Sequence, residues 1–362
     1  MARCRAVHVP GGDREGLSDR AGGGDVHEHA PRAELPAARS DVRVRRPADQ
    51  GEINVATTAA TAGRIAATPG AARASRSLWS NAWWKLRRDR LTIGAFILLT
   101  IFALLAAAAP LLSEYVFHYR FAQQDLLHTY EKPQFDNLAY LLGTDEIGRS
   151  QVVRLLYGGQ VSLGVGFVAA LVNLTVGIAV GLTAGYFRGV IDDGVTFVIT
   201  TLNGIPQIYL FLIIAALWQP GPYVLIAIIG LLNWTGITLY VRGQTFSLRE
   251  REFITAAHTI GARDRRIMFR HILPNVLPLI FVLAAIDVGA IILLESALSF
   301  LGFGILPPTP SWGNMLTNGA SYFVRAWWLV VSPGVMIFLT VLCLYLIGDG
   351  LRDALDPRLK TH

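Results

Sequence analysis

Long apolar runs alternate with short polar segments over most of the chain, and this alternation predicts its fold. A helix needs about 20 apolar residues to cross the hydrocarbon core of a bilayer, and six runs have roughly that length. They are Leu91–Ser113, Val161–Phe187, Gly194–Trp218, Tyr223–Val241, Leu273–Phe303 and Trp327–Gly348. The pattern therefore predicts an all-α membrane protein with six transmembrane helices.

The composition supports a membrane protein, because 52% of the 362 residues are hydrophobic and the mean hydropathy is +0.43. The first 78 residues differ from the rest and contain no Phe, Trp or Tyr. Such a segment buries too little apolar area to offset the entropy of the chain. We expect residues 1–78 to be a disordered extension, or to precede the true start of translation. Residues 79–362 are then the membrane domain.

The net charge of +6 comes from clustered basic residues. Lys and Arg gather before the first span, between the fourth and fifth spans, and after the sixth. A six-span topology places all three groups on one side, and the positive-inside rule makes that side the cytoplasm. Both termini are therefore expected in the cytoplasm. The residues concerned are Arg73, Arg76, Lys85, Arg87, Arg88, Arg90, Arg242, Arg249, Arg251, Arg263, Arg265, Arg266, Arg270, Arg352, Arg358 and Lys360.

Motifs that indicate an enzyme are absent from the sequence. There is no Gly-x-x-x-x-Gly-Lys-[Ser/Thr] loop to hold ATP phosphates, no Gly-x-Ser-x-Gly elbow and no His-Glu-x-x-His pair. The two cysteines, Cys4 and Cys343, are too few for a disulfide framework or a Cys-based metal site. We expect no catalytic residue, no metal site, no cofactor and no nucleic-acid partner.

The polar, Arg-rich segment 249–275 is the strongest candidate for a functional site. Two adjacent small alanines allow one short helix to lie close to another surface, and Gly261 permits a tight turn into a second helix. Pro274 then opens the fifth span, where its missing N–H costs little. The alternative is a basic loop that only sets the topology. The candidate residues are Thr255, Ala256, Ala257, Gly261, Arg263, Asp264, Leu273 and Pro274.

This segment resembles the cytoplasmic coupling loop of ABC-importer permease subunits. Over residues 80–360 the chain resembles the C-type permease subunit of dipeptide and oligopeptide ABC importers. Thr255 departs from that family's pattern, in which Glu is common, and this puts a salt bridge from that position to the ATPase in question. The other matching segments are Gly143–Arg149, Leu294–Gly302, Pro307–Gly313 and Gly348–Pro357.

The resemblance implies a type I ABC importer permease fold, a place in a bacterial cytoplasmic (inner) membrane, and the role of a transmembrane pore that is coupled to ATP hydrolysis by other subunits. It implies a homologous second permease subunit in a heterodimer, two cytoplasmic ABC ATPase subunits at the coupling loops, and an extracytoplasmic substrate-binding protein. A permease for nickel or another small solute in the same family is the alternative. Outside the family, the alternatives are a secondary transporter or channel that works alone and a purely structural membrane protein.

Two acids lie within the predicted spans, Asp287 and Glu295, both on the fifth. Acids inside a membrane usually face a cavity or a partner, so they are candidates for the translocation path or for a subunit interface. A local hydrogen bond is the alternative for each. Asn203 and Gln207 raise the same question on the third span, where Pro206 is expected to kink the helix.

Overall fold

The computed structural model describes residues 78–218 and 221–355. Their regular secondary structure is helical, and they form no β-strand beyond an isolated bridge between Thr144 and Ser150. Five helices are long and apolar enough to cross a membrane, and a bent helix pair makes a sixth candidate span. The predicted all-α membrane fold is therefore confirmed. The proposed extension 1–78 lies outside the described residues except for Leu78, and so do Arg358 and Lys360 in the tail.

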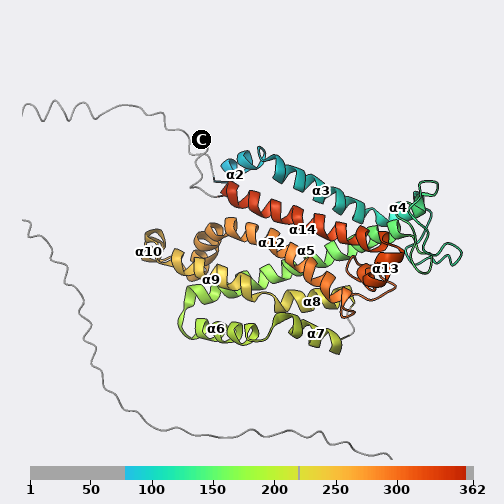
Figure 1. Ribbon diagram of the computed structural model, residues 1–362. Coiled ribbons are helices and arrows are strands. Elements are labelled where there is room, and N and C mark those ends of the chain that lie inside the picture. Colours follow the sequence, from blue (N-terminus) through green and yellow to red (C-terminus); the bar gives the residue numbers. More distant parts are fainter. Residues whose placement is uncertain (1–77, 219–220, 356–362) are drawn as a thin grey trace, which may run out of the picture. The chain divides into compact units, whose positions relative to one another are not determined.

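The described residues form sixteen helical elements, and Figure 1 shows α10 near one end of them and α4 near the other. Their bounds are α2 Leu78–Leu86, α3 Arg90–Ala107, α4 Ala109–Tyr115, η1 Leu138–Tyr140, α5 Gln151–Phe187, α6 Gly189–Asn203, α7 Gln207–Leu217, α8 Pro222–Leu232, α9 Thr235–Arg249, α10 Glu252–Thr259, α11 Asp264–Ile267, η2 Met268–Ile272, α12 Leu273–Phe300, η3 Asn314–Leu316, α13 Gly319–Arg325 and α14 Trp328–Leu355.

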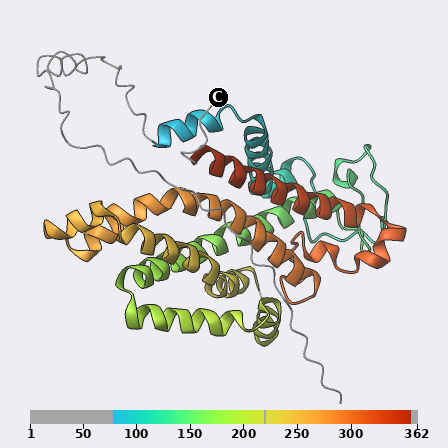
Figure 2. The same ribbon diagram turned by 60° about the vertical axis from the view of Figure 1, so that its left-hand side comes forward.

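The long helix α5 lies at the centre of the helix packing. It contacts α8, α9 and α12, while α12 also packs against α14, and α14 against α3 and α2 (Figures 1 and 2). The largest hydrophobic cluster draws buried side chains from all of the long helices, including Ala169 of α5, Ile291 of α12 and Leu344 of α14. A shared core of this kind fixes the helices relative to one another.

The contact between α5 and α9 depends on glycines spaced four residues apart. Gly177, Gly181 and Gly185 lie on one face of α5 and point at α9. A Cβ added at Gly177 would lie 2.8 Å from the Cβ of Ile237, and one at Gly185 would lie 2.7 Å from the Cβ of Thr245. Small residues at this spacing allow two helices to approach closely in a membrane, so α9 is held firmly against α5.

The third predicted span is not one continuous helix. Helices α6 and α7 meet at an angle of 83° across the break at Gly204–Pro206. Pro206 supplies no backbone N–H, and it disfavours the helical conformation at Ile205 before it. The kink expected at Pro206 is therefore present and is sharp. The fourth span also has a break, since α8 ends at Leu232 and α9 begins at Thr235 and runs to Arg249.

Helix α12 of the fifth span begins at Leu273 with Pro274 in its first turn, as the sequence predicts. The sequence does not show that α11 and a π-turn run into it without a break, so that one continuous helix extends from Asp264 to Phe300. A π-turn at Met268–Ile272 explains how the proline is accommodated, because a wider turn relaxes the hydrogen-bond ladder next to a residue that has no N–H. The side chain of Asn275 donates from Nδ2 to the carbonyl of His271 at 2.6 Å, which satisfies one acceptor in this turn.

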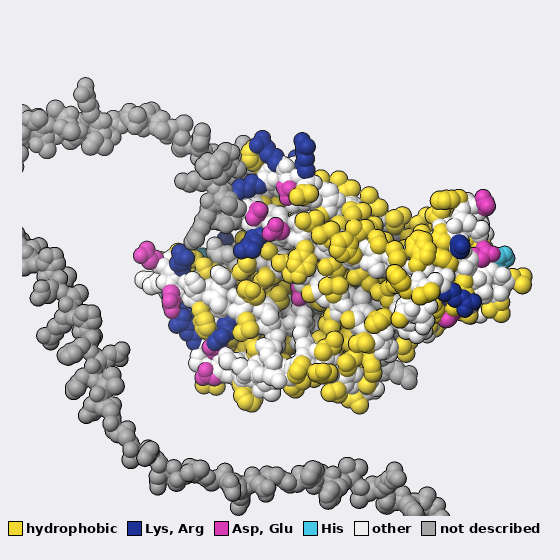
Figure 3. Space-filling view, in the orientation of Figure 1, with side chains coloured by type: hydrophobic (Ala, Val, Ile, Leu, Met, Phe, Trp, Pro, Cys, Tyr) yellow, Lys and Arg dark blue, Asp and Glu magenta, His cyan; other side chains and the backbone are white. Residues whose placement is uncertain are grey.

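Charged side chains gather at the two ends of the helices. In the face that Figure 3 shows, hydrophobic side chains cover the middle, and most Lys and Arg lie at the end that carries α2 and α10. The opposite end has the loops 116–150 and 301–327. Apolar side chains such as Phe96, Phe167 and Phe338 are exposed along the sides of the helices. Their exposure fits contact with lipid or with partner helices.

The segment Gly143–Arg149 forms a tight turn before α5. The carboxylate of Asp145 accepts hydrogen bonds from the backbone N–H of Ile147 at 3.1 Å and of Arg149 at 2.9 Å, and from Nε of Arg149 at 2.6 Å. Gly148 has a φ of +73°, and a Cβ there would overlap the backbone of Asp125. The residues of this motif therefore serve the local fold of the loop.

Two hydrogen bonds tie this turn to the chain beyond α12. Nε1 of Trp328 donates to the carbonyl of Thr144 at 3.2 Å, and Oη of Tyr322 donates to Glu146 at 2.7 Å. Burial, together with the hydrogen bond to Glu146, raises the pKa of Tyr322 to about 12. The hydroxyl therefore stays a neutral donor at physiological pH.

Candidate functional site

The segment between α9 and α12 folds as a helix, a turn and a second helix, as the sequence predicts. Helix α10 ends in a left-handed cap at Gly261, whose φ is +80°. The N–H of Gly261 donates to the carbonyl of His258 at 2.9 Å, and the N–H of Ala262 donates to the carbonyl of Ala257 at 3.0 Å. This pair of bonds is a Schellman motif. Arg263 and Asp264 then begin α11.

The two alanines of α10 have different surroundings. Ala257 is 5% exposed and belongs, with Ile254, to a hydrophobic cluster formed by α5, α9 and the start of the fifth span. Ala256 and Thr255 are exposed. The expectation that both alanines approach another surface is therefore corrected, because Ala257 is already covered by this chain and only Ala256 remains available to a partner.

An apolar stripe lies on the outer face of α10. Phe253 is 45% exposed and Ile260 is 85% exposed, and Ala256 lies between them at helical spacing. Exposed basic side chains flank the stripe, namely Arg251, Arg263, Arg265 and Arg266. Anchors at positions i, i+3 and i+7 are the pattern with which a helix enters a groove of another protein.

Tyr186, at the end of α5, fastens the α10–α11 segment to the central helix. Its Oη donates to Oδ1 of Asp264 at 2.7 Å and lies 3.3 Å from Nε2 of His258. Its ring stacks on the ring of His258, and the guanidinium of Arg249 lies 5.5 Å from its centroid. One buried aromatic side chain therefore contacts α9, α10 and α11. Sequence reasoning missed it, and a Tyr at the end of an apolar span was the available signal.

Glu295 lies in a local hydrogen-bond network and faces neither a cavity nor a partner surface. It is fully buried, and its carboxylate accepts hydrogen bonds from Ser162 of α5 at 2.9 Å and from Ser299 at 2.7 Å. Ser162 in turn accepts from the N–H of Trp312 at 3.1 Å. The acid therefore attaches the loop after α12 to α5. For Glu295 the structure supports the alternative of a local hydrogen bond, which replaces the candidate role on a translocation path or at a subunit interface.

Asp287 belongs to a second polar cluster, which lies between four helices. Asn173 of α5 donates from Nδ2 to Oδ2 of Asp287 at 2.6 Å, and Asn233 donates to Oδ1 at 3.4 Å. Gln207 donates from Nε2 to Oδ1 of Asn233 at 2.6 Å. This polar chain runs from a buried asparagine on α5 to an exposed glutamine at the start of α7.

The cluster joins the two broken spans. Asn203, the last residue of α6, accepts a hydrogen bond from Thr235 at 3.3 Å, and Thr235 begins α9. The helix breaks thus place polar side chains of Asn203, Gln207 and Asn233 in one region, next to Asp287. Sequence reasoning singled out Asp287, Asn203 and Gln207. It missed Asn233 and Asn173, because a lone Asn in an apolar run does not reveal its partner.

The described residues contain no group of three or more His, Cys, Asp or Glu side chains that could hold a metal ion. The helices and the two sites described above define a multi-span membrane protein. It has a polar cluster between its helices and an ordered helical segment at its basic end.

Comparisons with known proteins identify the family to which the chain belongs. Residues 177–361 match the family described as the binding-protein-dependent transport system inner membrane component, and residues 77–133 match the N-terminal TM domain of oligopeptide transport permease C. The chain belongs to this family of inner membrane transport components.

Relatives named as peptide permeases cover most of the chain. An oligopeptide transport system permease protein of Haemophilus influenzae is 35% identical over 283 residues, which are 78% of this chain and 89% of the relative. A dipeptide transport system permease protein of Alkalihalophilus pseudofirmus is 38% identical over 285 residues, 79% of this chain and 91% of the relative. A glutathione transport system permease protein of Pectobacterium atrosepticum is 35% identical over 289 residues, which are 79% of this chain and 93% of the relative.

These matches confirm the family resemblance, and the chain is a permease component of an ABC transport system in the inner membrane. It is not the enzyme of that system, because ATP hydrolysis belongs to separate subunits. A partner permease, ATPase subunits and a substrate-binding protein complete a system of this kind. The alternatives of a stand-alone transporter or channel and of a purely structural protein are excluded.

Substitution of Gly261 tests the cap of α10. A Cβ at this position meets no atom within 4 Å, so the cost comes from the positive φ alone. We expect Gly261→Val to loosen the turn by about 1–2 kcal/mol, whereas Gly261→Asn is tolerated because Asn adopts this conformation readily. Amide hydrogen exchange over residues 252–264 of the purified protein should be faster in the valine variant only. Equal exchange in both variants would contradict this account of the turn.

Proposed function

We propose that this chain is the transmembrane pore subunit of an ATP-driven importer of dipeptides or oligopeptides. Support for the solute class comes from the relatives, which are named for oligopeptides, dipeptides and glutathione. Residues 79–362 form the permease domain, with the coupling segment at 249–275. A homologous second permease subunit pairs with it in a heterodimer, and an extracytoplasmic binding protein delivers the solute.

The observation that carries the coupling role is the exposed apolar stripe of Phe253, Ala256 and Ile260 on α10. An exposed apolar patch with a charged rim is typical of a protein interface. Each of the two ATPase subunits binds the α10–α11 segment of one permease subunit. Motion of the ATPase reaches α5 through Tyr186 and through Ile254, which is fully buried in the cluster beneath α10.

The basic end of the helices lies in the cytoplasm in this proposal. The described basic residues near α2, α10 and the end of α14 outnumber those at the other end, where Arg120, Lys132 and Arg325 are exposed. The positive-inside rule then orients the chain with both termini in the cytoplasm. Only this orientation gives a cytoplasmic ATPase access to the stripe on α10.

The cluster of Asp287, Asn203, Gln207 and Asn233 lies on the translocation path in this proposal. Its exposed members adjoin the sharp break between α6 and α7, and non-helical backbone at membrane depth is tolerated where it lines a cavity or is covered by protein. Hydrogen-bonding side chains at this place offer partners to the peptide groups of a solute that leaves water. A carboxylate also attracts the ammonium group of a peptide.

Two neighbouring substitutions on α10 test the coupling role. Ala256→Asp puts a charge on the exposed stripe, so we expect normal amounts of membrane protein but weak co-purification of the ATPase subunits and little substrate-stimulated ATP hydrolysis. Ala257→Asp puts the charge in the buried cluster instead and should lower the amount of folded protein. Gln124→Asp, exposed at the opposite end, is the control for added charge. Full ATPase retention in Ala256→Asp would show that the stripe is not the docking surface.

The two acids of α12 should differ in transport. Asp287→Asn keeps the shape of the side chain but removes its charge, so we expect uptake of a labelled dipeptide by the assembled importer to fall about tenfold or more, the equivalent of about 1.4 kcal/mol. Glu295→Gln should lower the amount of folded protein, since a buried acceptor of several hydrogen bonds is lost, and leave uptake per molecule unchanged.

The same assay separates the solute classes. Uptake of labelled Ni²⁺ without uptake of any peptide would support the nickel permease alternative and refute the peptide assignment. Unchanged peptide uptake per molecule in Asp287→Asn would remove Asp287 from the path while leaving the peptide assignment intact.

Thiol labelling tests the orientation. Single cysteines at Ser247 and Lys132, both exposed, are introduced after Cys4→Ser and Cys343→Ala have removed the native thiols. A membrane-impermeant maleimide should label Lys132→Cys in intact cells and Ser247→Cys only after the membrane is opened. Labelling of Ser247→Cys in intact cells would reverse the orientation and rule out a cytoplasmic partner on α10.

A further inference from the structure

Helix α2 lies against the end of α14 and precedes the first span by a turn of three residues (Figure 1). Ala82 is buried in this contact, whereas Trp83 is 60% exposed and Trp84 is 40% exposed. Trp side chains of this kind are enriched where hydrocarbon meets the headgroups of a bilayer. The position of α2 at the start of a span and its two exposed indoles place it at that boundary.

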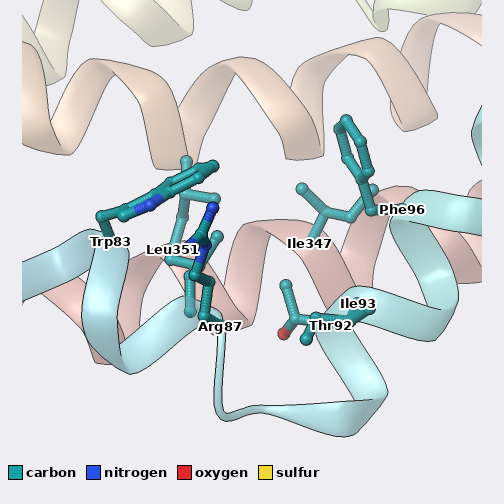
Figure 4. A pocket seen from close by; sticks show the side chains of 8 residues that line it. Trp83, Arg87, Thr92, Ile93, Phe96, Ile347 and Leu351 are labelled. Atoms are coloured by element: carbon teal, nitrogen blue, oxygen red, sulfur yellow. The ribbon is translucent and has the colours of Figure 1, made fainter.

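The Trp83 side chain lines two apolar cavities. One has a volume of about 230 Å³ and lies between α2, the start of α3 and the end of α14, with Phe96, Ile347 and Leu351 in its wall (Figure 4). The other has a volume of about 270 Å³ and reaches Phe281 of α12. An apolar cavity of about 150 Å³ binds a benzene ring, so each of these cavities has room for a longer hydrocarbon segment.

One cationic side chain, Arg87, lines the first cavity and lies 4.8 Å from the Trp83 ring centroid (Figure 4). The guanidinium of the next residue, Arg88, lies 3.6 Å from the ring centroid of Trp84. Arg87, Arg88 and Arg90 are exposed, and none of them forms an ion pair with an acid among the described residues. The acid between them, Asp89, is occupied as the N-cap of α3.

We propose that α2 and the end of α14 form a binding site for one anionic phospholipid. Its two acyl chains occupy the two cavities that Trp83 lines, and its phosphate is bound by Arg87 and Arg88. Two hydrocarbon cavities, with Arg87 in the wall of one and Arg88 next to it in the sequence, match the two chains and the single negative headgroup of such a lipid. Guanidinium groups bind phosphate through parallel hydrogen bonds, and the stacked Trp rings hold them in place.

The charge and the position of the site favour a lipid over a protein segment. Basic pockets between helices at the cytoplasmic face are typical binding places for anionic headgroups. The bound lipid would hold α2 on α14, and α14 packs directly against α12, which continues into the α10–α11 segment. The lipid would therefore stabilise the basic end of the helices. The inference does not depend on which solute is transported.

The test measures lipid binding to the full-length protein in mild detergent by native mass spectrometry. Phosphatidylglycerol and phosphatidylcholine with identical acyl chains are the probes. We expect the wild type to bind one phosphatidylglycerol more tightly than phosphatidylcholine. Because each basic residue near a membrane surface contributes about fivefold, Arg87→Gln with Arg88→Gln should weaken phosphatidylglycerol binding roughly thirtyfold and leave phosphatidylcholine unchanged.

Two further variants complete the design. Arg120→Gln with Lys132→Gln removes the same charge from the opposite end and should leave binding at the wild-type level. Ile347→Trp fills the first cavity and should weaken the binding of both lipids. The proposal is overturned if the wild type binds the two lipids equally, or if the double arginine variant keeps its preference. Cross-linking of Trp83→Cys to the second permease subunit, with no lipid retained, would also overturn it and assign the surface to a subunit interface.

Discussion

The close contact between α5 and α9 is the constraint on which the rest of the structure depends. Glycines at positions 177, 181 and 185 bring the two backbones together where any side chain would overlap α9. Between helices in a membrane the hydrophobic effect gives little attraction, so close packing of this kind supplies much of the association energy. This contact also fixes the position of the end of α9 relative to α5, and therefore the position of α10, which follows α9 in the chain.

The α10–α11 segment is rigidly joined to the helices for the same reason. Ile254 and Ala257 are buried against α5 and α9, and Tyr186 contacts α9, α10 and α11 at once. Because α11 continues through a π-turn into α12, we expect a displacement of α10 in the proposed coupling to reach both α5 and α12. Those two helices also carry Asn173 and Asp287. In the proposed function, the surface that binds the ATPase and the polar cluster are thus connected by packed helices.

The two acids of α12 show how the surroundings decide the role of a residue. Glu295 is enclosed by serines and attaches a loop, while Asp287 adjoins two helix breaks and exposed amide side chains. Both follow the rule that a buried charge needs hydrogen-bond partners. Only the second has partners that extend to the surface of the chain, so only it remains a candidate for contact with a solute.

The sequence by itself determined the class of the fold, because the length of an apolar run is set by the thickness of the bilayer and needs no knowledge of neighbours. It also determined the helix, turn and helix around Gly261, since a left-handed cap is a local requirement of the backbone. Only the tertiary structure decided that Ala257 is buried and Ala256 exposed, that Glu295 is enclosed, and that Asn173 and Asn233 join Asp287. These outcomes depend on which faces of distant helices meet, and chain spacing does not fix that.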